Sequence, residues 1–214
     1  MLKNTSKETV LSLDVSTKTG FAVLSSDGLD YQLLAYGQLP KISEPEGSYP
    51  GNYVVWAYSV FKEISILVDR FAPDVLVIEE TASGSKNVYS QKILEFCHML
   101  IAKMIYETGI KSLYFMTEEW RRLAGCQMTK EESKHNKSVK KYKDKNSTSI
   151  AYDEKGKRVG KLTRKHINVR RANEVFGEFL REPLRMKDED TADALLLAFT
   201  FHAKKIKGVA NGGI

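Results

Sequence analysis

The first forty residues alternate between apolar runs and short polar breaks, which predicts three consecutive β-strands. Apolar residues dominate 8–16, 19–26 and 31–39, and the second and third runs are separated by Asp27 and Gly28, a tight-turn signature. The first run has little polar alternation, as expected for a strand that is buried on both faces. We therefore expect three antiparallel strands, with the first at the centre of a sheet.

Helical spacing alternates with short strands through the rest of the chain. Apolar residues recur at helical intervals over 54–71, before Pro73, and over 87–108, before Gly109. The remaining predicted elements are strands at 74–80 and 112–117 and helices at 118–124, from about Thr163, and at 189–205. Because helices connect the fourth and fifth strands to the first three, the pattern predicts an α/β fold with a mixed five-stranded sheet flanked by helices.

The length of the chain suits a single compact domain. The sequence has 214 residues, of which 42% are hydrophobic, and it contains no internal repeat, so we expect one domain over 1–214. One segment, at about 126–163, differs from the rest because it is rich in lysine and has weak apolar periodicity. We interpret it as an insertion before the C-terminal helices and not as a second core.

Composition excludes several classes of protein. Charged residues make up 28% of the chain, and the longest apolar stretches, 195–201 and 99–105, are far shorter than the ~20 residues of a membrane span. The first ten residues lack the apolar core of a secretory signal, so we expect the protein inside the cell, in the cytoplasm. Two cysteines, Cys97 and Cys126, make neither a disulfide framework nor a zinc cluster.

Positive charge is concentrated in one part of the chain. The net charge is +6, yet residues 126–171 contain eleven lysines and four arginines against five acidic residues. Such a segment suits a polyanionic partner, and Lys140 and Lys141 within it are candidate phosphate contacts. The alternative is a solvated surface insertion with no partner.

Acidic residues occur directly beside apolar runs at three places. Asp14 lies within the first strand, Glu79 ends the fourth, and Asp190 and Asp193 are three residues apart on the last helix, where both point to the same side. Each has an ordinary alternative, such as a turn, a surface ion pair or a favourable position in the first helical turn. If the elements converge, however, the four carboxylates could not ionise together without cations, which indicates a site for two Mg²⁺ or Mn²⁺ ions.

These acidic motifs resemble those of a known family. Residues 14–23 (DVSTKTGFAV), 77–79 (VIE) and 190–195 (DTADAL) are similar to the three motifs of the RuvC-type Holliday-junction resolvases, which belong to the RNase H-like nucleases. The resemblance implies an RNase H-like fold with Asp14, Glu79, Asp190 and Asp193 as catalytic metal ligands. It also suggests that Lys165 occupies a basic position before the last helices, whereas the lysine-rich insertion has no counterpart.

Other residues near the motifs each have two possible roles. Lys18 and Lys86 flank the first two motifs and are candidate phosphate contacts, or simply solvated lysines. The family often has an aromatic wedge three residues after the catalytic glutamate, but that position is Ala82 here, and Tyr89 is a possible substitute or a core residue. Glu80 adjoins Glu79, but strand alternation directs the two side chains to opposite faces.

The resemblance and the charge together predict a metal-dependent endonuclease that acts as a homodimer and cleaves branched DNA, with four-way junctions as the expected substrate. The predicted helix at 87–108 has more apolar surface than one packing face needs, and Phe96, Leu100 and Met104 on it form one line suited to a dimer contact. The alternatives are an RNase H-like nuclease acting on flaps, forks or structured RNA, an actin-like ATP-dependent kinase, and a non-catalytic nucleic-acid-binding protein.

Overall fold

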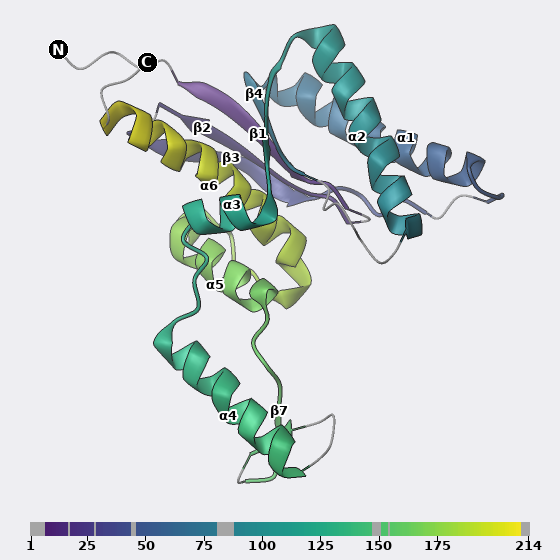
Figure 1. Cartoon of the computed structure of the whole chain (residues 1–214). Coiled ribbons are helices and arrows are strands. Elements are labelled where there is room, and N and C mark those ends of the chain that lie inside the picture. Colours follow the sequence, from purple (N-terminus) through teal and green to yellow (C-terminus); the bar gives the residue numbers. More distant parts are fainter. Residues whose placement is uncertain are drawn as a thin grey trace.

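The computed structural model of the chain is built around one five-stranded mixed sheet (Figure 1). The strand order is β3-β2-β1-β4-β5, in which β1 (Glu8–Asp14), β2 (Gly20–Ser26) and β3 (Tyr31–Gln38) are antiparallel. The other two strands, β4 (Val75–Glu79) and β5 (Lys111–Phe115), run parallel to β1. The predicted sheet is therefore confirmed. The structure describes residues 7–16, 18–27, 29–43, 46–80, 88–146, 151–153 and 155–210.

Helices cover both faces of the sheet, so that the chain has two hydrophobic cores. On one face lie α1 (Gly51–Phe71) and α2 (Val88–Thr108), which pack on side chains such as Leu11, Leu13, Leu76 and Ile78. On the other face α3 (Thr117–Leu123), α5 (Arg164–Phe176) and α6 (Glu189–Ala210) pack on Val10, Ala22, Val75 and Val77. A short 3-10 helix, Met186–Asp188, precedes α6. Alternate residues of β1 and β4 therefore enter different cores.

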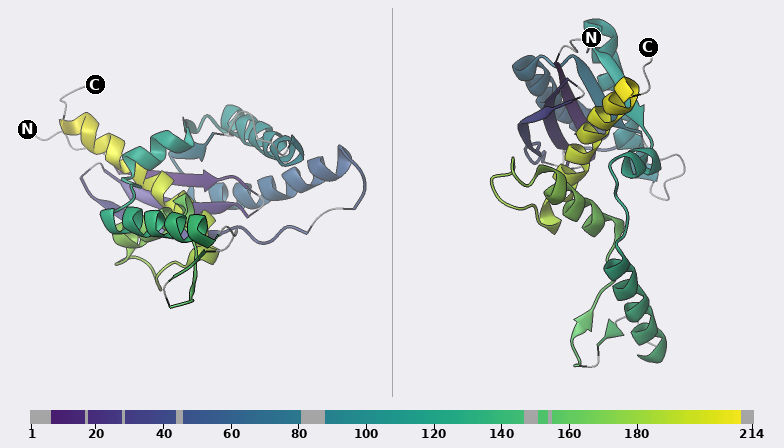
Figure 2. Two further views of the ribbon diagram at one scale, coloured as in Figure 1. Left: turned by 60° about the horizontal axis from the view of Figure 1, so that its bottom comes forward. Right: turned by 90° about the vertical axis from the view of Figure 1, so that its left-hand side faces the viewer.

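The lysine-rich insertion is more regular than its sequence pattern predicts. It forms α4 (Lys130–Asn146) and a hairpin of β6 (Ala151–Tyr152) and β7 (Arg158–Val159), and this arm projects away from the sheet (Figure 2). Apolar periodicity gave no sign of α4 because Val139 is its only buried hydrophobic residue among those described. Lysine and glutamate are nevertheless good helix formers, so composition alone permits a helix here.

Two further expectations need correction. The predicted dimer line on α2 is wrong for Met104, which is buried with Cys97 and Ile101 in the core beneath α1 and α2. Phe96 and Leu100 are only partly exposed and pack on the same core. The first helix begins at Gly51, three residues before the predicted start. Within the described residues, no helix is both long and apolar enough to cross a membrane.

A glycine in β2 allows α6 to lie directly on the sheet. An added Cβ at Gly20 would lie 2.0 Å from the backbone oxygen of Asp190, which is an impossible approach for any side chain. Nearby, the Ser12 hydroxyl of β1 donates a hydrogen bond of 2.7 Å to the carbonyl oxygen of Ala194 in α6. Because Gly20 pairs with Asp14 across the ladder, the start of α6 is held beside the end of β1.

Replacing Gly20 with Ala should therefore displace α6 and lower the melting temperature. The backbone clash cannot be relieved by rotating a side chain, so we expect a loss of at least about 2 kcal/mol, in the range of severe overpacking. Gly51→Ala is the matched control, since nothing lies within 4 Å of its added Cβ and the residue begins a helix. Equal thermal stability of the two variants would contradict the close approach of α6.

Candidate active site

The first two acids of the site lie at the ends of adjacent parallel strands. Leu13 of β1 pairs with Ile78 of β4, so that Asp14 and Glu79 follow at the same level of the ladder. Strand alternation directs both toward the core that contains α6, because the residues two positions before them, Ser12 and Val77, face that side. Glu80 is exposed and lines a separate surface cavity with residues of α2 and β5, so that it faces away from this site.

The first two turns of α6 bring the other two acids to the same place. Asp190 and Asp193 are three residues apart, with the buried Thr191 and Ala192 between them against the sheet. The charges of Asp193, Glu79 and Asp190 all act on the Asp14 carboxyl. The structure therefore brings together the four acids that the sequence nominated, from β1, β4 and α6.

Neighbouring side chains hold three of these carboxylates by hydrogen bonds. The Asn168 amide of α5 donates to Asp193 Oδ1 at 2.6 Å, and the Thr117 hydroxyl at the start of α3 donates to Glu79 Oε1. Gln38 Nε2, at the end of β3, donates a longer bond of 3.4 Å to Asp190 Oδ2. Asn168 is fully buried, so its amide is fixed in place beside Asp193.

Burial disfavours the charged form of every acid in the cluster, and nearby negative charges add to this effect. Burial raises the pKa of Asp14 well above its usual value, and the charges of Asp193, Glu79 and Asp190 raise it further. Burial also raises the pKa of Asp193 to about 7, despite the opposing bond from Asn168, with Glu79 adding to the rise. The pKa values of Glu79 and Asp190 are raised as well, again chiefly by burial. The positive charges nearby, such as that of Lys165 on Asp14, do not offset these rises in pKa.

Basic side chains surround the acids without neutralising them. Lys165 of α5 forms an ion pair with Glu189; burial alone would lower the pKa of this lysine, but Glu189, Asp190 and Asp193 together raise it. Lys18 acts on Asp190, and Arg121 of α3 acts on both Glu79 and Asp193. Lys165 therefore lies beside the cluster, and its contact with nucleic acid stays a prediction.

The donor set fits hard divalent cations. Carboxylate oxygens are the preferred protein ligands of Mg²⁺ and Mn²⁺, and cations would remove the repulsion that raises these pKa values. In the described part of the chain, no three His, Cys, Asp or Glu side chains converge closely enough to hold an ion in the conformation seen. Carboxylates without a cation between them repel one another and are expected to stay apart. The assignment of a divalent-cation site therefore rests on the position of the four acids near one another and on their raised pKa values.

The other nominated residues lie elsewhere or outside the described residues. Lys18 is exposed beside the site, and Lys140 and Lys141 are exposed on α4 in the projecting arm. Lys86 and the side chain of Tyr89 lie outside the described residues. A contact of these five residues with nucleic acid stays a prediction.

Sequence reasoning missed the residues that position the acids. Asn168 lies between Ile167 and Val169, and a polar residue inside a buried apolar stretch is a detectable signal. Thr117 comes two residues after the end of β5, the strand beside β4, so its position near the end of Glu79's strand could have been expected. Arg121 gave no signal, because one exposed-looking arginine on a short helix is common.

Comparisons with known proteins identify the fold. No family model matches the chain, and no curated protein matches its sequence. Among solved structures, Thermus thermophilus RuvC in complex with Holliday junction substrate matches with a TM-score of 0.62 and 14% identity, covering 94% of this chain and 97% of that chain. The yeast mitochondrial Holliday junction resolvase Ydc2 matches with a TM-score of 0.53 and 13% identity, covering 95% of this chain and 82% of that chain. The chain therefore has the RNase H-like fold of the RuvC-type resolvases, as its motifs predict.

Replacing Asp193 with Asn should stabilise the protein in metal-free buffer at pH 8, by about a few degrees in melting temperature. The pKa of Asp193 is about 7 in the folded protein against 3.8 ordinarily, so the folded state keeps a proton that the unfolded state releases between those values. Wild-type stability is therefore lost as the pH rises through this window, and Asn removes the loss while keeping an acceptor for Asn168.

The stabilisation should be small at pH 4.5, and Mg²⁺ should stabilise the wild type more than the variant. Glu178→Gln is a suitable control, because this exposed acid lies outside the cluster. Thermal melts at both pH values, with and without Mg²⁺, measure the effect. A destabilised Asp193→Asn variant at pH 8 would show that the carboxylate is not under electrostatic strain.

Proposed function

We propose that the protein is a metal-dependent endonuclease that cleaves branched DNA, with four-way junctions as its principal substrate. The observation that carries this proposal is the convergence of Asp14, Glu79, Asp190 and Asp193 at one edge of an RNase H-like sheet. The fold similarity to Thermus thermophilus RuvC bound to a Holliday junction favours branched DNA over other phosphodiesters. We expect the protein to act where the DNA of its host cell is kept.

The proposed chemistry is hydrolysis of a phosphodiester by in-line attack of water. Two bound Mg²⁺ or Mn²⁺ ions would supply activation of the water and stabilisation of the leaving 3′-oxygen. The four carboxylates would hold these ions, while Asn168 and Thr117 fix the orientation of Asp193 and Glu79. Lys165 would place positive charge beside the scissile phosphate, which develops negative charge during the reaction.

A homodimer is part of the proposal. Two cuts on opposed strands of a symmetric junction call for two active sites related by a two-fold axis. The outer face of α2 offers apolar surface for such a contact in Met99 and Tyr106, whose side chains are 60% and 90% exposed. Beside them, β5 is an edge strand with Leu113 and Tyr114 exposed.

Replacing any one of the four acids with its amide should lower junction cleavage by about 10²-fold or more, as expected when one group of a catalytic electrostatic site is lost. Junction binding should persist, because a negative charge near phosphate is removed. Glu80→Gln is the matched control, since Glu80 neighbours Glu79 in sequence but faces away from the site. It should cleave like the wild type.

The assay should use labelled four-way junctions, three-way junctions, flaps, forks, linear duplex and structured RNA with Mg²⁺. A cruciform plasmid adds a readout for the dimer, since paired cuts give linear product and single cuts give nicked circles. Near-normal cleavage by Asp193→Asn would refute the site. A preference for flaps, forks or RNA would replace the four-way junction as the proposed substrate. Binding without any cleavage would favour the non-catalytic nucleic-acid-binding protein, and ATP turnover would favour the actin-like kinase.

A further inference from the structure

The arm formed by residues 127–163 is internally braced. The side-chain amide of Asn136 in α4 makes two hydrogen bonds with the returning chain. It accepts one from the Leu162 backbone nitrogen at 2.8 Å and donates one to the Leu162 carbonyl oxygen at 3.0 Å. His135 bonds the Gly160 carbonyl at 2.8 Å, and Val139 is fully buried on the same side. One face of α4 is therefore occupied by the hairpin side of the arm.

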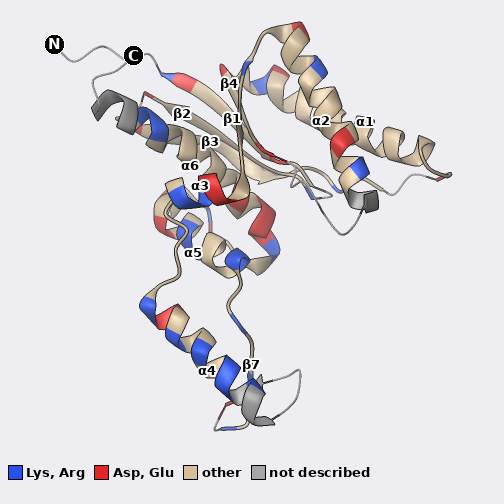
Figure 3. Ribbon diagram, viewed as in Figure 1, with Lys and Arg blue, Asp and Glu red and all other residues tan. Residues whose placement is uncertain are grey.

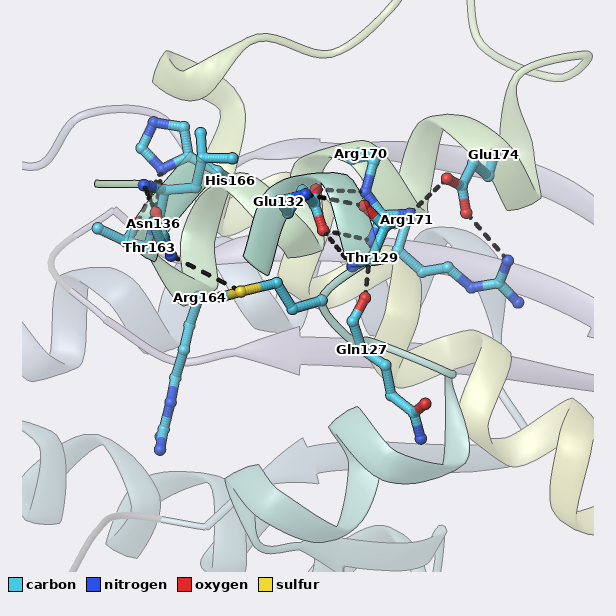
Figure 4. Close-up of polar contacts among 12 residues, drawn as sticks. Gln127, Thr129, Glu132, Asn136, Thr163, Arg164, His166, Arg170, Arg171 and Glu174 are labelled. Carbon is cyan, nitrogen blue, oxygen red and sulfur yellow. Dashed lines mark hydrogen bonds and ion pairs between the residues drawn. The ribbon is translucent and has the colours of Figure 1, made fainter. Parts of the chain in front are cut away.

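The base of the arm is fixed to α5 by one arginine (Figure 4). Arg170 donates to both carboxylate oxygens of Glu132, at 2.8 and 3.3 Å, and to the carbonyl of Gln127 at 2.8 Å. Glu132 also accepts the Thr129 backbone nitrogen at the start of α4, at 2.7 Å. A bidentate ion pair of this kind fixes the relative orientation of the two side chains as well as their distance. Because α5 also holds Lys165 and Asn168, the arm is built onto the helix that serves the acidic site.

The opposite face of α4 presents a row of lysines. Lys130, Lys134, Lys137 and Lys141 follow one another at intervals of four, three and four residues, which places them within about 60° on a helix. All four are exposed, and none forms an ion pair with another described residue. Lys and Arg positions recur along α4 and around the start of α5 (Figure 3). We call these four residues the lysine row.

The dimensions of the lysine row match a nucleic-acid strand. Eleven residues of helix separate its ends, a length of about 17 Å, over which one strand of a DNA duplex carries about five phosphates. Neighbouring lysines on a helix are about 5 to 6 Å apart, so successive side chains can reach successive phosphates. All four members of the row are lysines, whose charged ends suit phosphates, which favours contact with the backbone of a duplex.

We propose that the lysine row binds the phosphate backbone of one duplex arm of the branched substrate, at a distance from the cleavage site. This inference rests on the proposed nuclease function and extends it with a second contact surface on the same DNA. The arm leads directly into Arg164 and Lys165 at the start of α5, which pair with Glu118 and Glu189, and Lys165 lies beside the acids. The braced arm would thereby orient the junction on the active site without reading its sequence.

The test compares two variants of the full chain, each lacking four positive charges of the arm. One replaces the lysine row, Lys130, Lys134, Lys137 and Lys141, with alanine; the other replaces the exposed residues Lys155, Lys157, Arg158 and Lys161 of the hairpin side. Alanine is the best helix former, so α4 should remain folded, which circular dichroism can verify. Binding is measured without divalent metal by fluorescence anisotropy, over a range of salt, on junctions with long arms and with arms of about 8 base pairs.

We expect the lysine-row variant to bind the long-armed junction at least tenfold more weakly at ~100 mM salt, with a log-log salt slope smaller by about 3 to 4. Its affinity for the short-armed junction should match the wild type, and its cleavage at saturating protein with Mg²⁺ should persist, which separates this proposal from the nuclease proposal. Equal losses of affinity for the long-armed junction in the two variants would mean that only the net charge of the arm matters, and would overturn the proposal. An unchanged salt slope, or tighter wild-type binding to duplex RNA, would also overturn it.

Discussion

Repulsion among four partly buried carboxylates is the physical constraint on which this site depends. Burial raises the pKa values of Asp14, Glu79, Asp190 and Asp193, and the charges of the other three acids raise the pKa of Asp14 further. A fold keeps such an arrangement only if the rest of the structure over-determines it, because each acid alone would be more stable in water. The same arrangement of carboxylates is favourable when divalent cations bind, because it then provides their ligands.

The sheet and α6 supply the rigidity that holds the carboxylates together. The parallel pairing of β1 with β4 fixes Asp14 beside Glu79, and the missing side chain of Gly20 lets the first turn of α6 rest on the neighbouring strand. Ser12 ties α6 down one turn further along, so the helix cannot slide away from the strand ends. Each of these contacts involves only a few atoms, yet some of them join residues that are separated by most of the sequence.

Strand and helix patterns in the sequence were sufficient for the sheet and for the positions of the four acids in it and on α6, because both depend on strong and regular signals. A carboxylate that ends a buried strand, such as Glu79, is conspicuous against its apolar neighbours. The arm was not predictable in the same way, since α4 buries only Val139 among its described hydrophobic residues and is held by polar contacts with the returning chain. Asn168 has a local signal in its position between Ile167 and Val169, but its contact with Asp193 depends on the packing of α5 against α6, which the sequence pattern does not report.

Crystals grown with Mn²⁺ would test the central claim most directly, because the anomalous scattering of manganese locates each ion independently of the protein. If the four carboxylates form a two-metal site, two anomalous peaks should lie about 3.5 to 4 Å apart among Asp14, Glu79, Asp190 and Asp193. Replacing Asp193 with Asn should remove at least one of them. Peaks only elsewhere on the surface, at millimolar Mn²⁺, would contradict the account.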